Sequence, residues 1–321
     1  MLPNSARKIL IAFSDPGAAK SLLAFADAQD REKDILIVSD RVYDFYTLFN
    51  SQVSIISREM IFSIIKQFSP HAIFTGTSLS SYFEYDFWTY AHALKVLSYS
   101  YIDHYTSYMQ RFTRDGIAIF PDIICVPDQK AQLIAQRDLN CTTNCIVTGN
   151  FFIPWLSEWQ PKLSSSQVYR TLGISHAKKL WVFAPDPLSN VGGVEKYGMD
   201  EYSLLQSLIQ ILHRNDCSNI HLLIQCHPNQ DRGRMFNEIS KYPYLNISIN
   251  SSIEALNLIF HSKLVIGMFS NILLEANFLK VPIVRCLFHF KAVDPFADKK
   301  IGTTLYSETE LNNYLTSILN R

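Results

Sequence analysis

The strongest chemical signal lies in the C-terminal half, where the apolar run 264–266 ends at Gly267. Ser270 and Asn271 follow, and these residue types after a buried strand are typical of a helix start. A helix start carries a partial positive charge and unpaired N–H groups, so it can bind a phosphate. Glu275, on the same helical face as Asn271, could accept hydrogen bonds from ribose hydroxyls. The alternative is a capped helix with a solvent-facing glutamate, and we favour the nucleotide site.

Two other segments of this half carry polar groups after apolar runs. His227 and Pro228 follow the run 221–225. Proline fixes the backbone, so the imidazole has a defined direction and could offset charge on a leaving phosphate; a structural histidine is the alternative. Ser189 and Asn190 lie in a glycine-containing loop that either contacts a phosphate or base or is a flexible connection.

The N-terminal half has a similar arrangement after its first apolar run, 8–13, which is followed by Asp15, Pro16 and Gly17. The glycine allows a ligand to approach the backbone closely. Asp15 could accept a proton from a substrate hydroxyl, or it could cap the helix that follows, with Pro16 at its first position. The segment is not G-x-G-x-x-G, which disfavours a dinucleotide site.

A second group of ionisable residues in this half follows the run 96–100 and consists of Asp103, His104 and Arg111 in an aromatic setting. These types suit a polyhydroxyl or anionic ligand. The alternative is an exposed loop with one ion pair. The sequence has no G-x-S-x-G nucleophile elbow beside the histidine, which makes a hydrolase triad a poor interpretation.

Short apolar runs alternate with amphipathic segments and must position these side chains. The expected strands are 8–13, 34–39, 53–56, 72–75, 96–100, 123–126, 145–147, 180–183, 221–225, 245–249, 264–266 and 282–284. The expected helices are 18–29, 60–67, 82–94, 129–137, 201–214, 253–261, 271–278 and 308–319. This rhythm predicts an α/β fold with doubly wound parallel sheets, in which ligands bind beyond the carboxyl ends of the strands.

The rhythm breaks between residues 151 and 178, where prolines and a serine run indicate a link that could hold a short helix. We therefore expect two Rossmann-like domains facing a cleft. Residues 1–155 would form the acceptor-side domain, 156–305 the nucleotide-sugar domain, and 306–321 a C-terminal helix.

Composition excludes several classes of protein. Of the 321 residues 48% are apolar, which excludes a disordered chain, and 29 basic residues balance 29 acidic ones, which disfavours nucleic-acid binding. The six cysteines include one close pair, Cys141 and Cys145, without the second pair of a zinc site. Free thiols, a short N-terminal apolar run and no membrane-length apolar stretch predict a cytoplasmic protein.

The second half resembles the nucleotide-binding domain of GT-B glycosyltransferases and of the nonhydrolysing UDP-N-acetylglucosamine 2-epimerases. The resemblance lies in His227-Pro228, in Gly267-x-x-Ser270-Asn271-x-x-x-Glu275 and in the run 281–284. Within the superfamily it is nearest to bacterial sialyltransferases and Kdo transferases, whose acidic-glycine motif is similar to Asp15-Pro16-Gly17. Two departures are the single carboxylate before Gly17 and a Ser-Asn pair where paired hydroxyls are usual.

The resemblance implies an inverting, metal-independent glycosyltransferase without a cofactor, which moves a sugar from a nucleotide sugar to a glycan or glycolipid in envelope polysaccharide synthesis. A CMP-sugar is favoured and a UDP-sugar is possible, and the enzyme could associate peripherally with the inner face of the cytoplasmic membrane. The alternatives are a UDP-sugar 2-epimerase, a CDP-glycerol-type phosphotransferase and a non-catalytic sugar-nucleotide-binding protein.

The same resemblance implies roles for the candidate residues. Asp15 would be the general base, and His227 would stabilise the leaving group. The donor-side residues are Ser189, Asn190, His227, Pro228, Gly267, Ser270, Asn271 and Glu275. The acceptor-side residues are Gly17, Asp103, His104 and Arg111. The sequence contains no Asp-x-Asp motif, so a helix dipole and an imidazole would supply the charge stabilisation that a metal ion supplies elsewhere.

Overall fold

The computed structural model describes residues 6–29, 32–79, 81–139, 144–215 and 217–319. The chain divides into two compact units, residues 1–159 and 160–321, so the division falls after Trp159 and not after residue 155. Helix α6 (Phe152–Glu158) belongs to the first unit because it packs against α1 (Pro16–Asp27).

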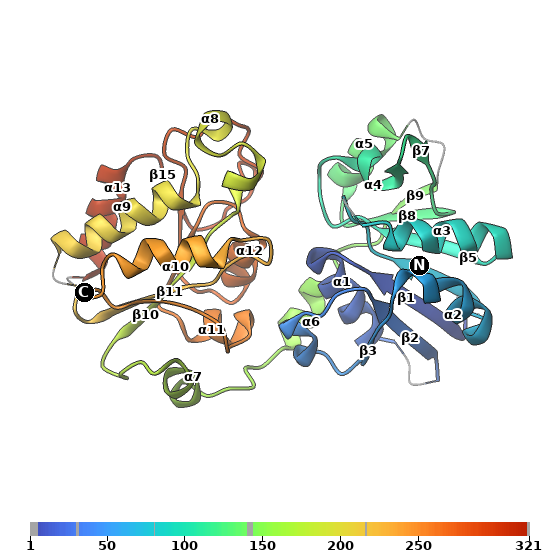
Figure 1. Cartoon of the computed structure of the whole chain (residues 1–321), viewed down its shortest axis with the longest axis horizontal. Coiled ribbons are helices and arrows are strands. Elements are labelled where there is room, and N and C mark those ends of the chain that lie inside the picture. Colours follow the sequence, from blue (N-terminus) through green and yellow to red (C-terminus); the bar gives the residue numbers. More distant parts are fainter. Residues whose placement is uncertain (1–5, 30–31, 80, 140–143, 216, 320–321) are drawn as a thin grey trace. The chain divides into compact units, whose positions relative to one another are not determined.

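The first unit contains a seven-stranded parallel sheet in the order β3-β2-β1-β4-β5-β8-β9 (Figure 1). Its strands are β1 (Lys8–Phe13), β2 (Asp34–Ser39), β3 (Val53–Ile55), β4 (Ala72–Thr75), β5 (Leu97–Tyr101), β8 (Ile123–Val126) and β9 (Asn144–Val147). Its other helices are α2 (Ile61–Phe68), α3 (Phe83–Leu94), α4 (Tyr108–Phe112) and α5 (Gln129–Asp138). A small hairpin of β6 (Thr113–Arg114) and β7 (Ile117–Ala118) was not predicted.

Helices cover both faces of this sheet because successive residues of each strand point to opposite sides. Leu10 and Ile73 pack against Ile65 of α2 and Phe87 of α3 in one buried cluster. On the other side, the ring of Phe74 meets that of Phe25 of α1 at 5.1 Å. Burial on both faces accounts for the continuous apolar runs of these strands.

The second unit contains a six-stranded parallel sheet in the order β12-β11-β10-β13-β14-β15. Its strands are β10 (Lys179–Ala184), β11 (Ile220–Ile224), β12 (Ile247–Ile249), β13 (Leu264–Gly267), β14 (Ile283–Cys286) and β15 (Thr303–Leu305). Its helices are α7 (Ser165–Leu172), α8 (Gly193–Tyr197), α9 (Glu201–Arg214), α10 (Arg232–Ser240), α11 (Ala255–His261), α12 (Asn271–Phe278) and α13 (Glu308–Leu319), with a 3-10 turn at Leu188–Val191. Helices α8 and α10 and strand β15 were not predicted, and the predicted link 151–178 contains α6 and α7.

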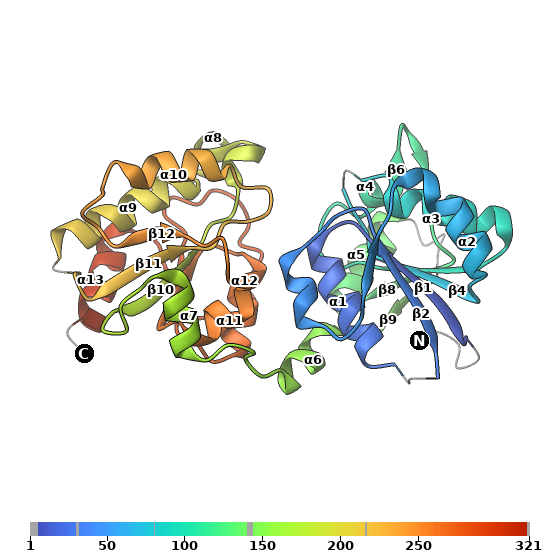
Figure 2. The same ribbon diagram turned by 60° about the horizontal axis from the view of Figure 1, so that its bottom comes forward.

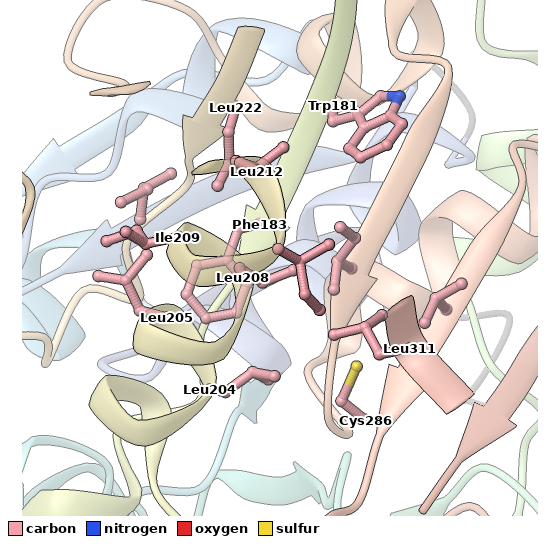
Figure 3. Packing of buried hydrophobic residues seen from close by; sticks show 14 of the residues in the cluster. Trp181, Phe183, Leu204, Leu205, Leu208, Ile209, Leu212, Leu222, Cys286 and Leu311 are labelled. Carbon is pink, nitrogen blue, oxygen red and sulfur yellow. The ribbon is translucent and has the colours of Figure 1, made fainter. Parts of the chain in front are cut away.

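Strand β10 lies at the centre of this unit and separates two cores. Trp181 and Phe183 pack with Leu208 of α9 and Leu311 of α13 on one face (Figure 3). The alternate residue Val182 faces α7, α11 and α12 on the other face, as the grouping of these helices in Figure 2 also shows. Helix α13 is thus part of the core of the second unit that contains Trp181 and Phe183. The predicted doubly wound α/β class is confirmed.

Candidate functional site

The strand order of the second unit reverses between β10 and β13. In doubly wound sheets, ligands bind outside the carboxyl ends of the strands at this reversal. Residues 184–193 follow β10, residues 225–231 follow β11 and residues 268–270 follow β13. The fold therefore brings the predicted donor-side segments to one edge of the sheet.

The turn from β13 into α12 has the predicted form. A Cβ at Gly267 would lie 2.8 Å from the Ala184 carbonyl oxygen, so a side chain here would push the two strands apart. Ser270 occupies the N-cap position but its side chain makes no capping hydrogen bond, so the simple capped-helix alternative is wrong. Asn271 is exposed at the first turn, and Glu275 is buried rather than solvent-facing. The helix start can therefore present backbone N–H groups to an anion.

A buried carboxylate that was not predicted lies beside this turn. The Asp186 Oδ2 accepts a hydrogen bond from the Phe269 N–H at 3.1 Å. Burial raises the pKa of Asp186 to about 7, although hydrogen bonds from the β13–α12 turn act to lower it. Asp186 thus joins the end of β10 to the turn that precedes α12.

Ser189 is held by a second buried carboxylate, Glu201 of α9. The Ser189 N–H and hydroxyl donate to Glu201 at 3.0 and 2.6 Å. The Gln230 side-chain amide donates to the same carboxylate at 2.8 Å. Glu201 is fully buried, so it fixes the turn after β10 to the turn after β11.

The His227 turn has a defined geometry. The Asn229 N–H donates to His227 Nδ1 at 3.1 Å, which places the proton of a neutral imidazole on Nε2. The Asn190 side-chain amide donates to the Asn229 carbonyl at 2.8 Å. Pro228 is exposed on this turn. Asn190 therefore braces the His227 turn in this structure.

The first unit has its own reversal between β1 and β4, and Asp15 lies there. Asp15 occupies the N-cap position of α1, but its side chain makes no capping hydrogen bond, so the capping interpretation is wrong. Burial raises the pKa of Asp15, and the negative charge of Asp103 raises it further, whereas Arg111 and Arg41 lower it. The Arg41 guanidinium lies 4.0 Å from the Asp15 carboxylate.

The predicted residues after β5 meet the start of α1. A Cβ on Gly17 would lie 1.9 Å from Asp103 Oδ2, so the carboxylate packs directly against this glycine. The exposed His104 approaches the same oxygen through Nε2 at 3.4 Å. Asp15, Gly17, Asp103 and His104 therefore lie at one edge of the first sheet, together with Arg111, which is buried there. The burial of Arg111 and of the Asp103 side chain differs from the predicted alternative of an exposed loop, although His104 is exposed.

Beneath these residues lies another buried carboxylate that was not predicted. Glu84 of α3 accepts a hydrogen bond from the Ser14 N–H at 2.8 Å. Burial raises the pKa of Glu84 to about 8. Its only sequence signal is that Glu84 and Asp86 are the two acidic residues of a helix rich in aromatic residues. The bond fixes the end of β1, from which Asp15 follows.

The described part of the chain contains no candidate metal site, membrane-spanning helix or disulfide bond. No group of three or more His, Cys, Asp or Glu side chains there is arranged to hold a metal ion. None of its helices is long and apolar enough to cross a bilayer. Its cysteines Cys125, Cys145, Cys217, Cys226 and Cys286 are free thiols, and Cys141 lies outside the described residues.

Comparison with known proteins adds structural neighbours only. No family model matches the sequence, and no curated protein matches it. A UDP co-structure of MnaA from S. aureus is 14% identical, covers 98% of this chain and 88% of its own, and has a TM-score of 0.66. The Methanocaldococcus jannaschii UDP-GlcNAc 2-epimerase in complex with UDP-GlcNAc and UDP is 14% identical, with 98% and 93% coverage and a TM-score of 0.64.

A glycotransferase of kitacinnamycin is 11% identical, covers 99% of this chain and 92% of its own, and has a TM-score of 0.54. At such low identities these similarities establish the fold and nothing finer. The two units have the Rossmann-like, GT-B-like architecture of these neighbours, and the GT-B resemblance is confirmed at the level of the fold.

Proposed function

We propose that the chain is an enzyme acting on a nucleotide sugar, which the second unit binds at the carboxyl ends of β10, β11 and β13. The observation that carries this proposal is the convergence of three polar turns at the strand-order reversal, beside the start of α12. The neighbours with bound UDP and UDP-GlcNAc have the same fold. Their ligands favour a UDP-sugar over the CMP-sugar that the motifs suggested.

Each side chain of this site has a proposed role. The Ser270 hydroxyl and the backbone N–H groups that open α12 from Asn271 onward bind phosphate oxygens. Glu275, one turn inside the helix, accepts hydrogen bonds from ribose hydroxyls. His227 donates from Nε2 to a phosphate oxygen, because Nδ1 already accepts from the backbone. Gly267 keeps the floor of the site open, and Ser189 and Asn190 border it.

Between the possible reactions we favour 2-epimerisation of a UDP-sugar. A 2-epimerase of the same fold corresponds to nearly the whole chain. Inversion at a sugar carbon requires a group that removes a proton and one that returns it. Carboxylates with raised pKa values suit this work near neutral pH, and Asp15 is of this kind.

Glycosyl transfer is the second candidate, supported by Asp15 and by the kitacinnamycin glycotransferase among the neighbours. In that reaction Asp15 would deprotonate an acceptor hydroxyl as it attacks the anomeric carbon. A glycan or glycolipid acceptor, envelope polysaccharide synthesis and peripheral association with the membrane belong to this candidate.

A thermal-shift screen against UDP, CDP, CMP and GDP tests the binding proposal first. We expect UDP to raise the melting temperature most, and no shift with any nucleotide would contradict the proposal. Substituting Glu275→Gln should reduce the UDP shift, whereas Glu195→Gln, an exposed glutamate of α8, should leave it unchanged.

Incubation of UDP-GlcNAc alone in D2O, followed by NMR, then separates the reactions. Formation of the C2 epimer with deuterium at C2 supports epimerisation. A stable substrate that releases UDP only when an acceptor panel is added supports transfer. CMP release from CDP-glycerol would indicate a phosphotransferase, and binding without any turnover would indicate a non-catalytic protein.

A further inference from the structure

Arg111 of the first unit is a buried cation whose charge acts on Asp15 but whose guanidinium forms no direct ion pair within the described residues. Only 3% of the surface of Arg111 is exposed to solvent. Within the described part of the chain its guanidinium bonds only to oxygens of Thr77 and Thr106, at 3.3–3.5 Å, and forms no ion pair with a carboxylate. Removing a guanidinium from water is costly unless an anion compensates it. The Arg111 guanidinium can therefore still pair directly with an anionic group of a ligand.

Asp103, which follows β5 in the same unit, is a carboxylate that lacks hydrogen-bond donors in the described part of the chain. Its side chain is only 9% exposed. Neither carboxylate oxygen accepts a hydrogen bond from the residues that the structure describes. His104 approaches one oxygen at 3.4 Å without hydrogen-bond geometry. Since a buried carboxylate offers about four acceptor sites, Asp103 is suited to bind the donors of a ligand.

The strand order places both residues at one location. Asp103 follows β5 and contacts Gly17 after β1, while Arg111 bonds to Thr77 after β4. Strand β4 lies between β1 and β5 in the sheet. The carboxyl ends of these strands form the reversal at which doubly wound sheets bind ligands.

We propose that the first unit binds an acidic sugar at the carboxyl ends of β1, β4 and β5. Arg111 would hold the carboxylate or phosphate group of this sugar, and Asp103 would accept hydrogen bonds from its hydroxyls. One observation on the site and one general property of hydroxyls favour hydroxyls over an ammonium group as the donors. The charges of Arg111 and Arg41 both act on Asp15, so the carboxylates Asp15 and Asp103 do not give this site an excess of negative charge. A neutral hydroxyl also loses less hydration than an ammonium on entering a buried site.

The test uses the full chain and isothermal titration with five probes: glucose, glucosamine, inorganic phosphate, glucuronate and glucose 6-phosphate. The proposal predicts that each acidic sugar binds about 10- to 100-fold more tightly than glucose, the effect of a hydrogen bond to a charged group. The acidic sugars should also bind more tightly than phosphate alone. Equal affinities for glucose and glucuronate, or tighter binding of glucosamine than of either acidic sugar, would overturn it.

Substitutions assign the two roles. Arg111→Gln should remove the preference for acidic sugars, and Asp103→Asn should weaken all sugars while leaving inorganic phosphate unchanged. Arg137→Gln, at an exposed arginine of the same unit, serves as the matched control and should bind as the wild type does. If Arg111→Gln does not fold, the wild-type comparison of acidic and neutral sugars still decides.

The anion could belong to a separate acidic sugar or to the phosphates of the nucleotide sugar itself. If UDP-GlcNAc displaces glucuronate and Arg111→Gln weakens UDP-GlcNAc, the anion is that of the nucleotide sugar. If the two bind together, it belongs to a separate sugar. The second unit is tested separately by UDP, whose binding Glu275→Gln should weaken in either case. Failure of this inference can thus be distinguished from failure of the proposed function.

Discussion

The Asp186 carboxylate accepts the Phe269 N–H at 3.1 Å, and this bond links the loop after β10 to the turn that opens α12. The two residues are distant in sequence, and they meet because β10 pairs with β13 in the sheet. The bond orients the turn from which the proposed phosphate-binding N–H groups emerge. It also places an acid with a pKa of about 7 inside the second unit.

This acid predicts a specific dependence of stability on pH. The folded pKa of Asp186, about 7, lies above the ordinary value of 3.8, so between these pH values the native state holds a proton that the unfolded state has lost. Its contribution to stability is therefore complete below pH 4 and is lost as pH rises through 7. Asp186→Asn keeps an acceptor for Phe269 and cannot ionise. We expect the unfolding free energy of wild type minus variant to fall by up to about 1.4 kcal/mol per pH unit between pH 4 and 7.

Urea unfolding from pH 4 to 8, with hydrogen exchange of second-unit amides, measures this difference. Other titrating groups are common to both proteins and cancel in the comparison. A difference that is constant with pH, or that rises with pH, would show that Asp186 is not protonated in the native state.

Glu201 predicts a link between stability and ligand binding. Glu201→Ala would leave the Ser189 and Gln230 donors without their buried acceptor, at about 1–3 kcal/mol for each lost partner. The turns after β10 and β11 would then lose their connection. We expect a loss of at least about 2 kcal/mol in unfolding free energy and weaker UDP binding.

The control is Glu195→Ala in the neighbouring helix α8, where the side chain is exposed. It should change stability by no more than about 0.5 kcal/mol. Unchanged UDP affinity in a destabilised Glu201→Ala variant would mean that the turns are not part of the binding site.

Most of the fold could be predicted from the sequence. The boundaries of β1, β2, β4, β8, α9, α12 and α13 agree with the predicted ranges, because runs buried on both faces and amphipathic helices are local patterns. The small hairpin and α8 were missed because they are too short to show a period. Helix α10 has a largely polar sequence, RGRMFNEIS, that hides its two buried positions, Met235 and Ile239.

The candidate site was predicted less completely. Residues directly after strands, such as Asp15 and Ser270, could be found because the position of a strand end is local information. Asp186, Glu201 and Glu84 could not, because their roles depend on donors that other strands bring to them. The contact of Asp103 with Gly17 is of the same kind, since it joins the ends of β5 and β1.

Asp15 gives a prediction about turnover. If it transfers a proton in the reaction, Asp15→Asn should lower turnover by about 10²- to 10⁴-fold, while UDP binding to the second unit stays unchanged. As a base it must be ionised, so wild-type activity should fall as pH drops through its pKa, which burial and Asp103 raise. Asp44→Asn, at an exposed aspartate of the same unit, is the control. Full activity in Asp15→Asn would remove this residue from the mechanism.

The close contact between Gly17 and Asp103 predicts the effect of adding a side chain at Gly17. An added Cβ would lie 1.9 Å from Asp103 Oδ2, closer than any two such atoms can approach, so Gly17→Ala must displace the Asp103 carboxylate. If the displaced carboxylate moves away from Asp15, its charge will contribute less to the raised pKa of Asp15. The low-pH limb of the activity profile should consequently shift to lower pH, and affinity for sugar hydroxyls should fall.

Gly233→Ala is the matched control, because its new Cβ would lie 3.4 Å from the nearest atom, in ordinary contact, within helix α10. It should stabilise the chain slightly, by up to about 1 kcal/mol, since alanine favours a helix more than glycine does. A pH profile in Gly17→Ala that matches the wild type would mean that the charge of Asp103 does not contribute to the pKa of Asp15. A crystal structure of that variant with Asp103 in place would contradict the close contact itself.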